Sequence, residues 1–132
     1  MTQTNIYIMD KIVDELANGK TLSQALQTVY IQRSVAIPFN EKAFDANIRI
    51  LDLSVRSNNA LLRNGLETIG DVVAFSINNK LTNLRNMGVT SAAEVFEKIL
   101  DYCWSKLTKQ EKVDFIIDTV ERNEINMKPE LF

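Results

Sequence analysis

The short turn Asn86-Met87-Gly88 joins two helical patterns, and this feature constrains the fold more than any other in the chain. A short helix is predicted before the turn, over residues 79–85. A longer helix is predicted after it, over residues 90–104, where one apolar stripe recurs at helical spacing: Ala92, Val95, Phe96, Ile99 and Cys103. Because so tight a turn joins the two helices, the pattern indicates a helix-hairpin-helix motif.

The composition is that of an ordinary globular protein. A chain of 132 residues with 45% hydrophobic side chains and only 4 Gly and 2 Pro can bury one core. No apolar run approaches the roughly 20 residues that a membrane span needs, and the first residues lack the basic and apolar regions of a secretion signal. We therefore expect a cytoplasmic protein with no membrane partner.

The side chains that enzymes use most often are missing from this sequence. It contains no His, the commonest general base and transition-metal ligand, and no Gly-rich phosphate loop or nucleophile elbow. Cys103 is the single cysteine, and its apolar neighbours favour a buried position over a catalytic one. The carboxylates show no recognisable metal-ligand spacing. We predict no enzymatic activity, no catalytic residue, no cofactor and no metal site.

An N-terminal helical hairpin is predicted before the central segment. Gly19 suits the left-handed position that ends its first helix, and Thr21 with Gln24 is a capping-box start for the second. The hairpin could read DNA as a helix-turn-helix, although its polar residues offer little charge for phosphates. Otherwise it packs on the next domain or on a second copy of the protein. Its apolar stripes are Met9, Ile12, Val13 and Leu16, then Leu22, Ala25, Leu26 and Val29.

Pro38 forbids a helix through the residue before it, so an extended connector is predicted between the hairpin and the central segment. The connector is rich in apolar side chains, and we expect it to dock on a surface. Asn40 can cap a short turn after it. The segment boundaries follow from these breaks and divide the protein into residues 1–45, 46–104 and 105–132.

The C-terminal segment begins with another capping-box pair, Thr108 with Glu111. A last amphipathic helix follows, and the residues of its apolar face are Val113, Ile116, Ile117 and Val120. Residues 126–132 are expected to be loose, as terminal segments often are.

One helix of the central segment, capped by Ser54, carries a polar stripe. Arg56, Asn59 and Arg63 lie within about 60° of one another on a helix of 100° per residue. Val55 and Leu62 occupy another sector, so we expect that pair to face the core and the polar stripe to face outward. Two other roles stay open for Arg56, which could simply be a solvated side chain or pair with Asp52.

Three sequence blocks stand in a fixed order in the central segment. They are LDLSVRS at residues 51–57, TIGD at 68–71 and RNMG at 85–88, followed by Ser91 and Glu94. On these blocks, residues 48–100 resemble the C-terminal domain of the alpha subunit of bacterial RNA polymerase. That module touches upstream promoter DNA and transcription activators. The stretch from Gly70 to Gly88 is one residue longer here than in the family.

The resemblance implies a role for each matching residue. It places Arg56 in the DNA minor groove with Asn59 beside it, and Ala60 where the family has a small contacting residue. A narrow A/T-rich minor groove is strongly negative and attracts a guanidinium without a unique base pattern. The DNA-contacting residues that we predict are Arg56, Asn59, Ala60, Arg63, Gly88, Thr90, Ser91 and Glu94.

At the hairpin, Gly88 lets a backbone approach a phosphate closely, and the N–H groups that open the next helix can bind it. Ser91 can add a hydroxyl. In the family basic residues follow this glycine, whereas Val89 and Thr90 stand here, so DNA binding should be weak. A structural alternative is that Ser91 and Glu94 form a capping box, which could coexist with phosphate binding.

The sequence therefore predicts an all-α protein. Its centre is a compact helix-hairpin-helix domain of the RNA polymerase alpha C-terminal type, flanked by the N-terminal hairpin and the C-terminal amphipathic helix. We expect a transcription-associated protein that binds A/T-rich double-stranded DNA weakly, with RNA polymerase or a transcription regulator as a protein partner. A homodimer is also open, because it would restore avidity.

Two other functions remain as alternatives at this point. The first is an interaction module that binds polymerase, a sigma factor or an activator without DNA. The loss of basic residues after Gly88 and the acidic C-terminal segment favour it. The second is a nuclease or repair enzyme, because other helix-hairpin-helix proteins have these activities.

Overall fold

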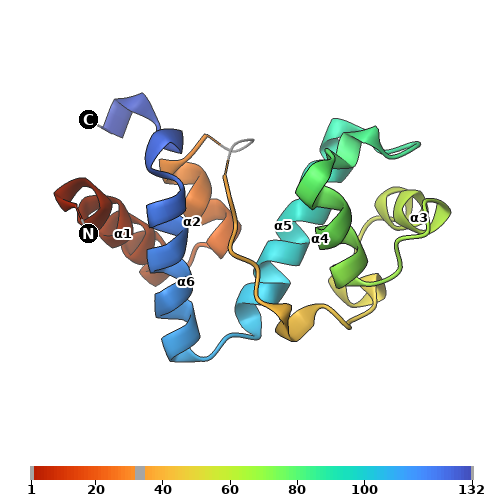
Figure 1. Cartoon of the computed structure of the whole chain (residues 1–132), viewed down its shortest axis with the longest axis horizontal. Helices are drawn as coiled ribbons and strands as arrows, with labels where there is room; N and C mark the ends of the chain where they lie inside the picture. The colour runs from red at the N-terminus through yellow and green to blue at the C-terminus, as the bar shows by residue number, and fades with distance from the viewer. Residues whose placement is uncertain (1, 32–34, 132) are drawn as a thin grey trace. The chain divides into compact units, whose positions relative to one another are not determined.

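The computed structural model describes residues 2–31 and 35–131. This part of the protein forms six α-helices and no strand, so the all-α prediction is confirmed (Figure 1). The helices are α1 (Gln3–Ala17), α2 (Leu22–Val29), α3 (Val55–Arg63), α4 (Ile69–Asn78), α5 (Val89–Ser105) and α6 (Lys109–Arg122). Short 3₁₀ helices complete it: η2 (Glu41–Ala43), η3 (Ile48–Leu51), η4 (Leu81–Asn83), η5 (Glu124–Asn126) and η6 (Pro129–Leu131). None of the helices described is long and apolar enough to cross a membrane.

Local capping residues start most of these helices where the sequence predicts. Thr21 and Thr108 each accept the N3 backbone N–H of their helix, and the N3 side chain returns the bond, which completes both capping boxes. Ser54 caps α3 through the N–H of Ser57. Gly19, at φ +91°, follows the end of α1 in the left-handed conformation that glycine tolerates best.

The backbone contacts divide the protein into two compact units. The first unit combines Met1–Phe39 with Leu107–Phe132, and the second is Asn40–Lys106. The first and last parts of the sequence therefore belong to the same compact unit. We call them the terminal unit and the central unit.

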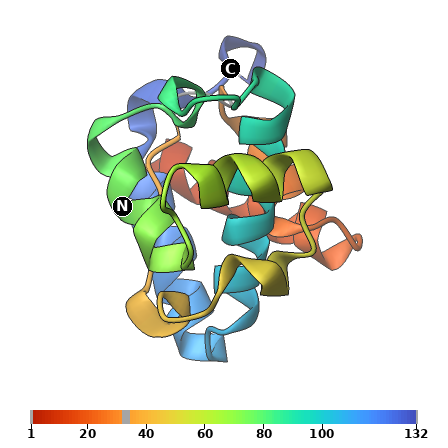
Figure 2. The same cartoon turned by 90° about the vertical axis from the view of Figure 1, so that its right-hand side faces the viewer.

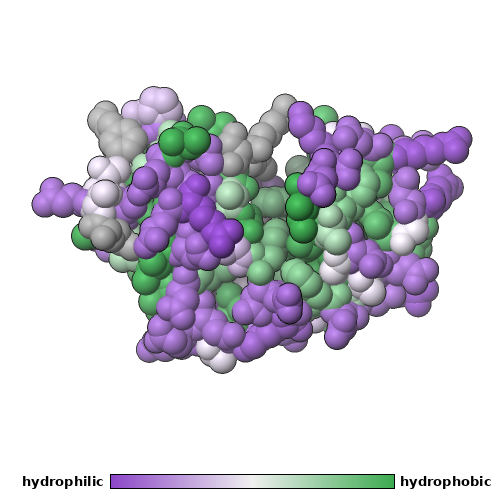
Figure 3. Space-filling model, viewed as in Figure 1, coloured by the Kyte–Doolittle hydropathy of each residue, from purple (hydrophilic) through white to green (hydrophobic). Residues whose placement is uncertain are grey.

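In the terminal unit, α1 contacts both α2 and α6. Helix α1 of the hairpin therefore packs on both α2 and the C-terminal helix. Ile8 and Ile12 of α1 are fully buried, whereas Val13, which the predicted stripe includes, is 47% exposed. The buried face of α1 thus shares Ile12 with the predicted stripe but includes Ile8 and leaves Val13 exposed. The outer face of α6 is mainly hydrophilic (Figure 3).

The C-terminal tail is held against the hairpin as far as Lys128, so the expectation of a loose tail is wrong for residues 126–128. Residues Pro129–Leu131 form the 3₁₀ helix η6, and Phe132 lies outside the described residues. Tyr30 and Met127 form an antiparallel bridge. The N–H of Lys128 donates to the Val29 carbonyl at 3.0 Å, and the N–H of Ile31 donates to the Asn126 carbonyl at 3.0 Å. The connector before Asn40 is also half-buried at Val35, Ile37 and Phe39, as expected for a docked segment.

In the central unit, α3 packs across α5 (Figure 2), and η2, η3 and η4 also contact α5. The core combines Leu61 of α3 with Ile69 and Val72 of α4 and with Val95 and Ile99 of α5. Cys103 is buried, as predicted, and burial raises the pKa of its thiol to about 11. A buried thiol with a raised pKa is unreactive, so Cys103 is a core residue.

Gly70 is a glycine that the central unit requires. Its N–H donates to the Phe44 carbonyl at 2.9 Å, and a Cβ at this position would lie 3.0 Å from the same oxygen. The TIGD block therefore allows η2 to approach α4 closely.

Candidate nucleic-acid interface

The polar stripe of α3 faces solvent. Arg56, Asn59 and Arg63 all lie on the outer side of the helix, as their spacing predicts. Arg56 forms no ion pair with Asp52 within residues 2–31 and 35–131, so its guanidinium is available to a ligand.

The prediction that Val55 and Leu62 face the core is wrong. Val55 is 76% exposed and Leu62 is 38% exposed, whereas Ser57, Ala60 and Leu61 form the buried face. The residues that repeat the apolar spacing therefore lie away from the core. A buried serine replaces apolar side chains there because a partner on α5 satisfies its hydroxyl.

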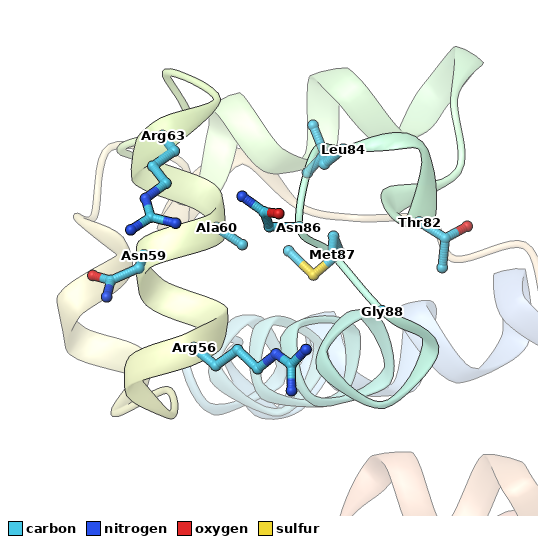
Figure 4. Close-up of a pocket in the computed structure, with 9 residues that line it drawn as sticks. All are labelled: Arg56, Asn59, Ala60, Arg63, Thr82, Leu84, Asn86, Met87 and Gly88. Carbon is cyan, nitrogen blue, oxygen red and sulfur yellow. The ribbon is translucent and has the colours of Figure 1, made fainter.

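A groove of about 630 Å³ runs between α3 and the turn before α5 (Figure 4). Arg56 extends from α3 toward the start of α5, and Asn86 and Met87 point from the turn toward α3. Ala60 lies beneath the stripe and is only 2% exposed. We call this the α3–turn groove; it is lined by Arg56, Asn59, Ala60, Arg63, Thr82, Leu84, Asn86, Met87 and Gly88.

The groove brings together five of the eight predicted DNA-contacting residues. These are the four from α3 and Gly88. Thr90 and Glu94 lie in a separate hollow along α5 with Val89, Ala93, Glu97, Lys98 and Asp101. Ser91 lines neither and is only 8% exposed.

The left-handed residue of the turn is Asn86 and not Gly88. Asn86 has φ +67°, whereas Gly88 has φ −84° and ψ 174°, which any residue can adopt. No atom lies within 4 Å of the Cβ that Gly88 lacks, so the fold leaves open space there. Gly88 is also the N-cap of α5 and forms no side-chain cap. The first N–H groups of α5 therefore donate no hydrogen bond to an N-cap side chain.

The capping box between Ser91 and Glu94 does not form, because α5 begins earlier, at Val89. The Glu94 carboxylate turns to α3 instead. It accepts hydrogen bonds from Ser54 N at 3.0 Å, Ser54 Oγ at 2.8 Å and Ser57 Oγ at 2.5 Å. The hydrogen bond from Ser57, followed by those from Ser54 and the charge of Lys98, holds the pKa of Glu94 below its ordinary value despite partial desolvation.

Asn64 also shapes the groove, although the sequence did not single it out. Its Nδ2 donates to the Ala60 carbonyl at 2.7 Å and to the Arg85 carbonyl at 3.1 Å. The residue therefore ties the end of α3 to the hairpin turn. An asparagine at a helix C-terminus is a local signal for a cap, but the partner 21 residues away is not.

The fold and the groove define a helix-hairpin-helix domain. Exposed arginine side chains lie beside a turn whose backbone is not covered by neighbouring atoms at Gly88. Residues 37–101 match the family of the C-terminal domain of the bacterial RNA polymerase alpha subunit. This stretch is a domain of that family, which is associated with transcription and DNA contact and is not catalytic. The prediction of no enzymatic activity is thereby confirmed for this domain, and the nuclease alternative has no support from its family.

The relatives that match are DNA-directed RNA polymerase alpha subunits. The subunit of Mycoplasmopsis synoviae is 38% identical over 58 residues, which are 44% of this chain and 17% of that subunit. The Nitratiruptor subunit is 36% identical over 86 residues, or 64% of this chain and 26% of the subunit. The Clavibacter michiganensis subunit is 29% identical over 100 residues, or 76% and 27%. The protein thus spans about a quarter or less of these relatives, and no solved structure gives a significant match.

Proposed function

We propose that this protein acts in transcription by binding A/T-rich double-stranded DNA through the α3–turn groove. The observation that carries the proposal is the stripe of Arg56, Asn59 and Arg63, which lies across the groove from the open backbone at Gly88. A minor groove and an adjacent phosphate are the two features of DNA that such a pair of surfaces fits.

In this proposal each wall of the groove has its own task. Arg56 enters the minor groove, Asn59 and Arg63 follow the same strand, and Ala60 lets the backbone of α3 come close. The start of α5 meets a phosphate at Gly88, and Thr90 and Ser91 follow closely in the sequence. Thr90 is exposed and can contribute directly, whereas Ser91 is largely buried and needs a small adjustment to do so.

Binding should be weak because the start of α5 carries no cation. Val89 and Thr90 are neutral, so only two or three phosphates are neutralised. The slope of the logarithm of the binding constant against the logarithm of the salt concentration should be about −2 to −3. The dissociation constant should be about 10⁻⁴ to 10⁻⁶ M.

Fluorescence anisotropy with matched A/T-rich and G/C-rich duplexes over a salt series tests the proposal. We expect binding in low salt with a preference for the A/T-rich duplex and the shallow salt dependence given above. Absence of binding to either duplex at high micromolar protein would reject it.

That negative result would favour a second function, a module that binds RNA polymerase, a sigma factor or a transcription regulator without DNA. The observation in its favour is the exposure of Val55 and Val89 at the starts of α3 and α5, where a nucleic-acid backbone gains little from apolar side chains. Binding of purified polymerase to the protein, measured without DNA, tests this alternative.

We also propose self-association and a cytoplasmic location, which suits a bacterial transcription domain. The apolar side chains Ile6, Tyr7 and Val13 remain exposed on α1, and a dimer would supply two DNA-binding grooves at once. Sedimentation near 15.0 kDa at tens of micromolar would contradict the dimer.

A further inference from the structure

Two side chains of α5, Glu94 and Lys98, bind the segment that leads into α3. Lys98 Nζ donates to the Asp52 carbonyl at 3.2 Å, while Glu94 binds Ser54 and Ser57. The two residues are one helical turn apart, so both project from the same side of α5. They therefore hold the bend at Asp52, whose φ is +51°, and the start of α3 that follows it.

Glu94 occupies a place where an anion is favourable. Its carboxylate meets the N-terminus of α3, where unpaired N–H groups and the helix dipole stabilise negative charge. It also satisfies the hydroxyl of Ser57, which is fully buried. Without this acceptor, the contact between α3 and α5 would lose the partner of a buried polar group.

We infer that Glu94 is a positioning residue for DNA binding and not a DNA contact, an inference that rests on the function proposed above. Arg56 lies between the two serines that Glu94 holds, so the carboxylate fixes where the stripe of α3 stands relative to Gly88. Glu94 itself lies outside the α3–turn groove. A carboxylate aimed at DNA would also repel the phosphates, and both of its oxygens already accept hydrogen bonds.

The test compares Glu94→Ala, Glu94→Gln and the control Glu41→Ala, which removes an equal charge from an exposed position of η2. Affinity for the A/T-rich and G/C-rich duplexes is measured well below each melting temperature. We expect Glu94→Ala to weaken A/T binding about tenfold, the factor that about 1.4 kcal/mol represents, and to reduce the A/T preference. The salt dependence should stay unchanged because no phosphate contact is lost. Glu94→Gln should recover part of the affinity, since its amide oxygen still accepts a hydrogen bond, and the control should bind as the wild type does.

Two results would overturn the inference. Stronger binding by Glu94→Ala than by the control would mean that the carboxylate simply faces the phosphates. An unchanged A/T preference in a folded Glu94→Ala variant would mean that Glu94 stabilises the fold without placing Arg56.

Amide hydrogen exchange separates this inference from the proposed function. If the wild type binds neither duplex, the proposed function fails, and exchange at Ser57 and Asn58 alone decides whether Glu94 holds α3. Faster exchange there in Glu94→Ala than in Glu41→Ala supports the positioning contact, and equal exchange rejects it.

Discussion

The side chain of Asn123 pairs with both backbone groups of Ala36, as a neighbouring strand would. Its Oδ1 accepts the Ala36 N–H at 2.7 Å, and its Nδ2 donates to the Ala36 carbonyl at 2.8 Å. The same amide binds the Thr119 carbonyl at 2.7 Å and receives a hydrogen bond from Asn126 at 2.9 Å. Asn123 is fully buried, so one side chain joins α6, the connector and the tail of the terminal unit.

Replacement of Asn123 by Ala should destabilise the protein by about 1–3 kcal/mol, because backbone partners of a buried amide lose their hydrogen bonds. Urea unfolding checks this. Asn78→Ala, which removes an exposed amide from α4, should change the free energy of unfolding by less than about 0.5 kcal/mol. Equal effects of the two substitutions would show that the Asn123 network contributes nothing.

Arg56→Ala should abolish the preference for A/T-rich DNA and cost about 1–3 kcal/mol of binding, because it removes the guanidinium from the minor groove. The melting temperature should hardly change, since Arg56 is exposed and forms no ion pair within the described residues. Arg49→Ala, at an exposed position of η3 outside the groove, is the control of equal charge. The control should keep the A/T preference, and an unchanged preference in Arg56→Ala would reject the assignment.

The elements that the sequence predicts well depend on near neighbours. Thr21 finds its capping partner three residues away, and so does Thr108, so the adjacent residues supply all the necessary information. The contacts that the sequence does not reveal join distant residues. Asn123 and Ala36 are 87 residues apart, and Glu94 and Ser54 are 40 apart. Neither pair leaves a local pattern.

The error at Val55 and Leu62 has a related cause. Periodicity defines the sectors of a helix, but it does not say which sector meets the core when polar and apolar residues are mixed. Ser57 takes a fully buried position of α3 because Glu94, far along the sequence, accepts the hydrogen bond from its hydroxyl. The candidate site residues on α3 could therefore be predicted as one exposed stripe, whereas the residues that hold the stripe in place could not.

Thr90→Lys should strengthen binding to both duplexes alike and steepen the log–log salt dependence by about 0.9, because one more phosphate is neutralised. Thr90 is exposed near the start of α5, where a lysine can extend without displacing a core side chain. Asn79→Lys adds the same charge at the exposed end of α4, away from the groove, and should have a smaller effect. Identical gains from both variants would indicate general attraction and no phosphate at α5.

Gly88→Ala and Gly70→Ala should affect different properties. An added Cβ at Gly88 meets no atom within 4 Å, so the melting temperature should fall little, while DNA binding should weaken because a phosphate can no longer come close. At Gly70 the Cβ would lie 3.0 Å from the Phe44 carbonyl oxygen, so this variant should lose stability. Thermal melting and anisotropy on both variants provide the comparison. Unchanged DNA binding by Gly88→Ala would show that no phosphate approaches the turn.

The contribution of the Glu94 carboxylate to stability should disappear in acid. Its pKa in the folded protein lies below the ordinary value of 4.5, so protons bind the unfolded state more readily. The stabilisation is therefore fully present above pH 4.5 and is lost as the pH falls through the lower pKa of the folded state. Wild type should melt at a higher temperature than Glu94→Gln at neutral pH, and the difference should close as the pH falls through the lower pKa of Glu94 in the folded state.

Asp71 shows the same direction of pKa shift, caused mainly by the N–H groups of Glu67 and Thr68, and this effect is common to the wild type and Glu94→Gln. Because such groups cancel in the comparison, the difference between the two melting curves reports Glu94 alone. A difference in melting temperature that stays constant from neutral pH into the acid range below 4.5 would mean that the charge of Glu94 does not stabilise the start of α3.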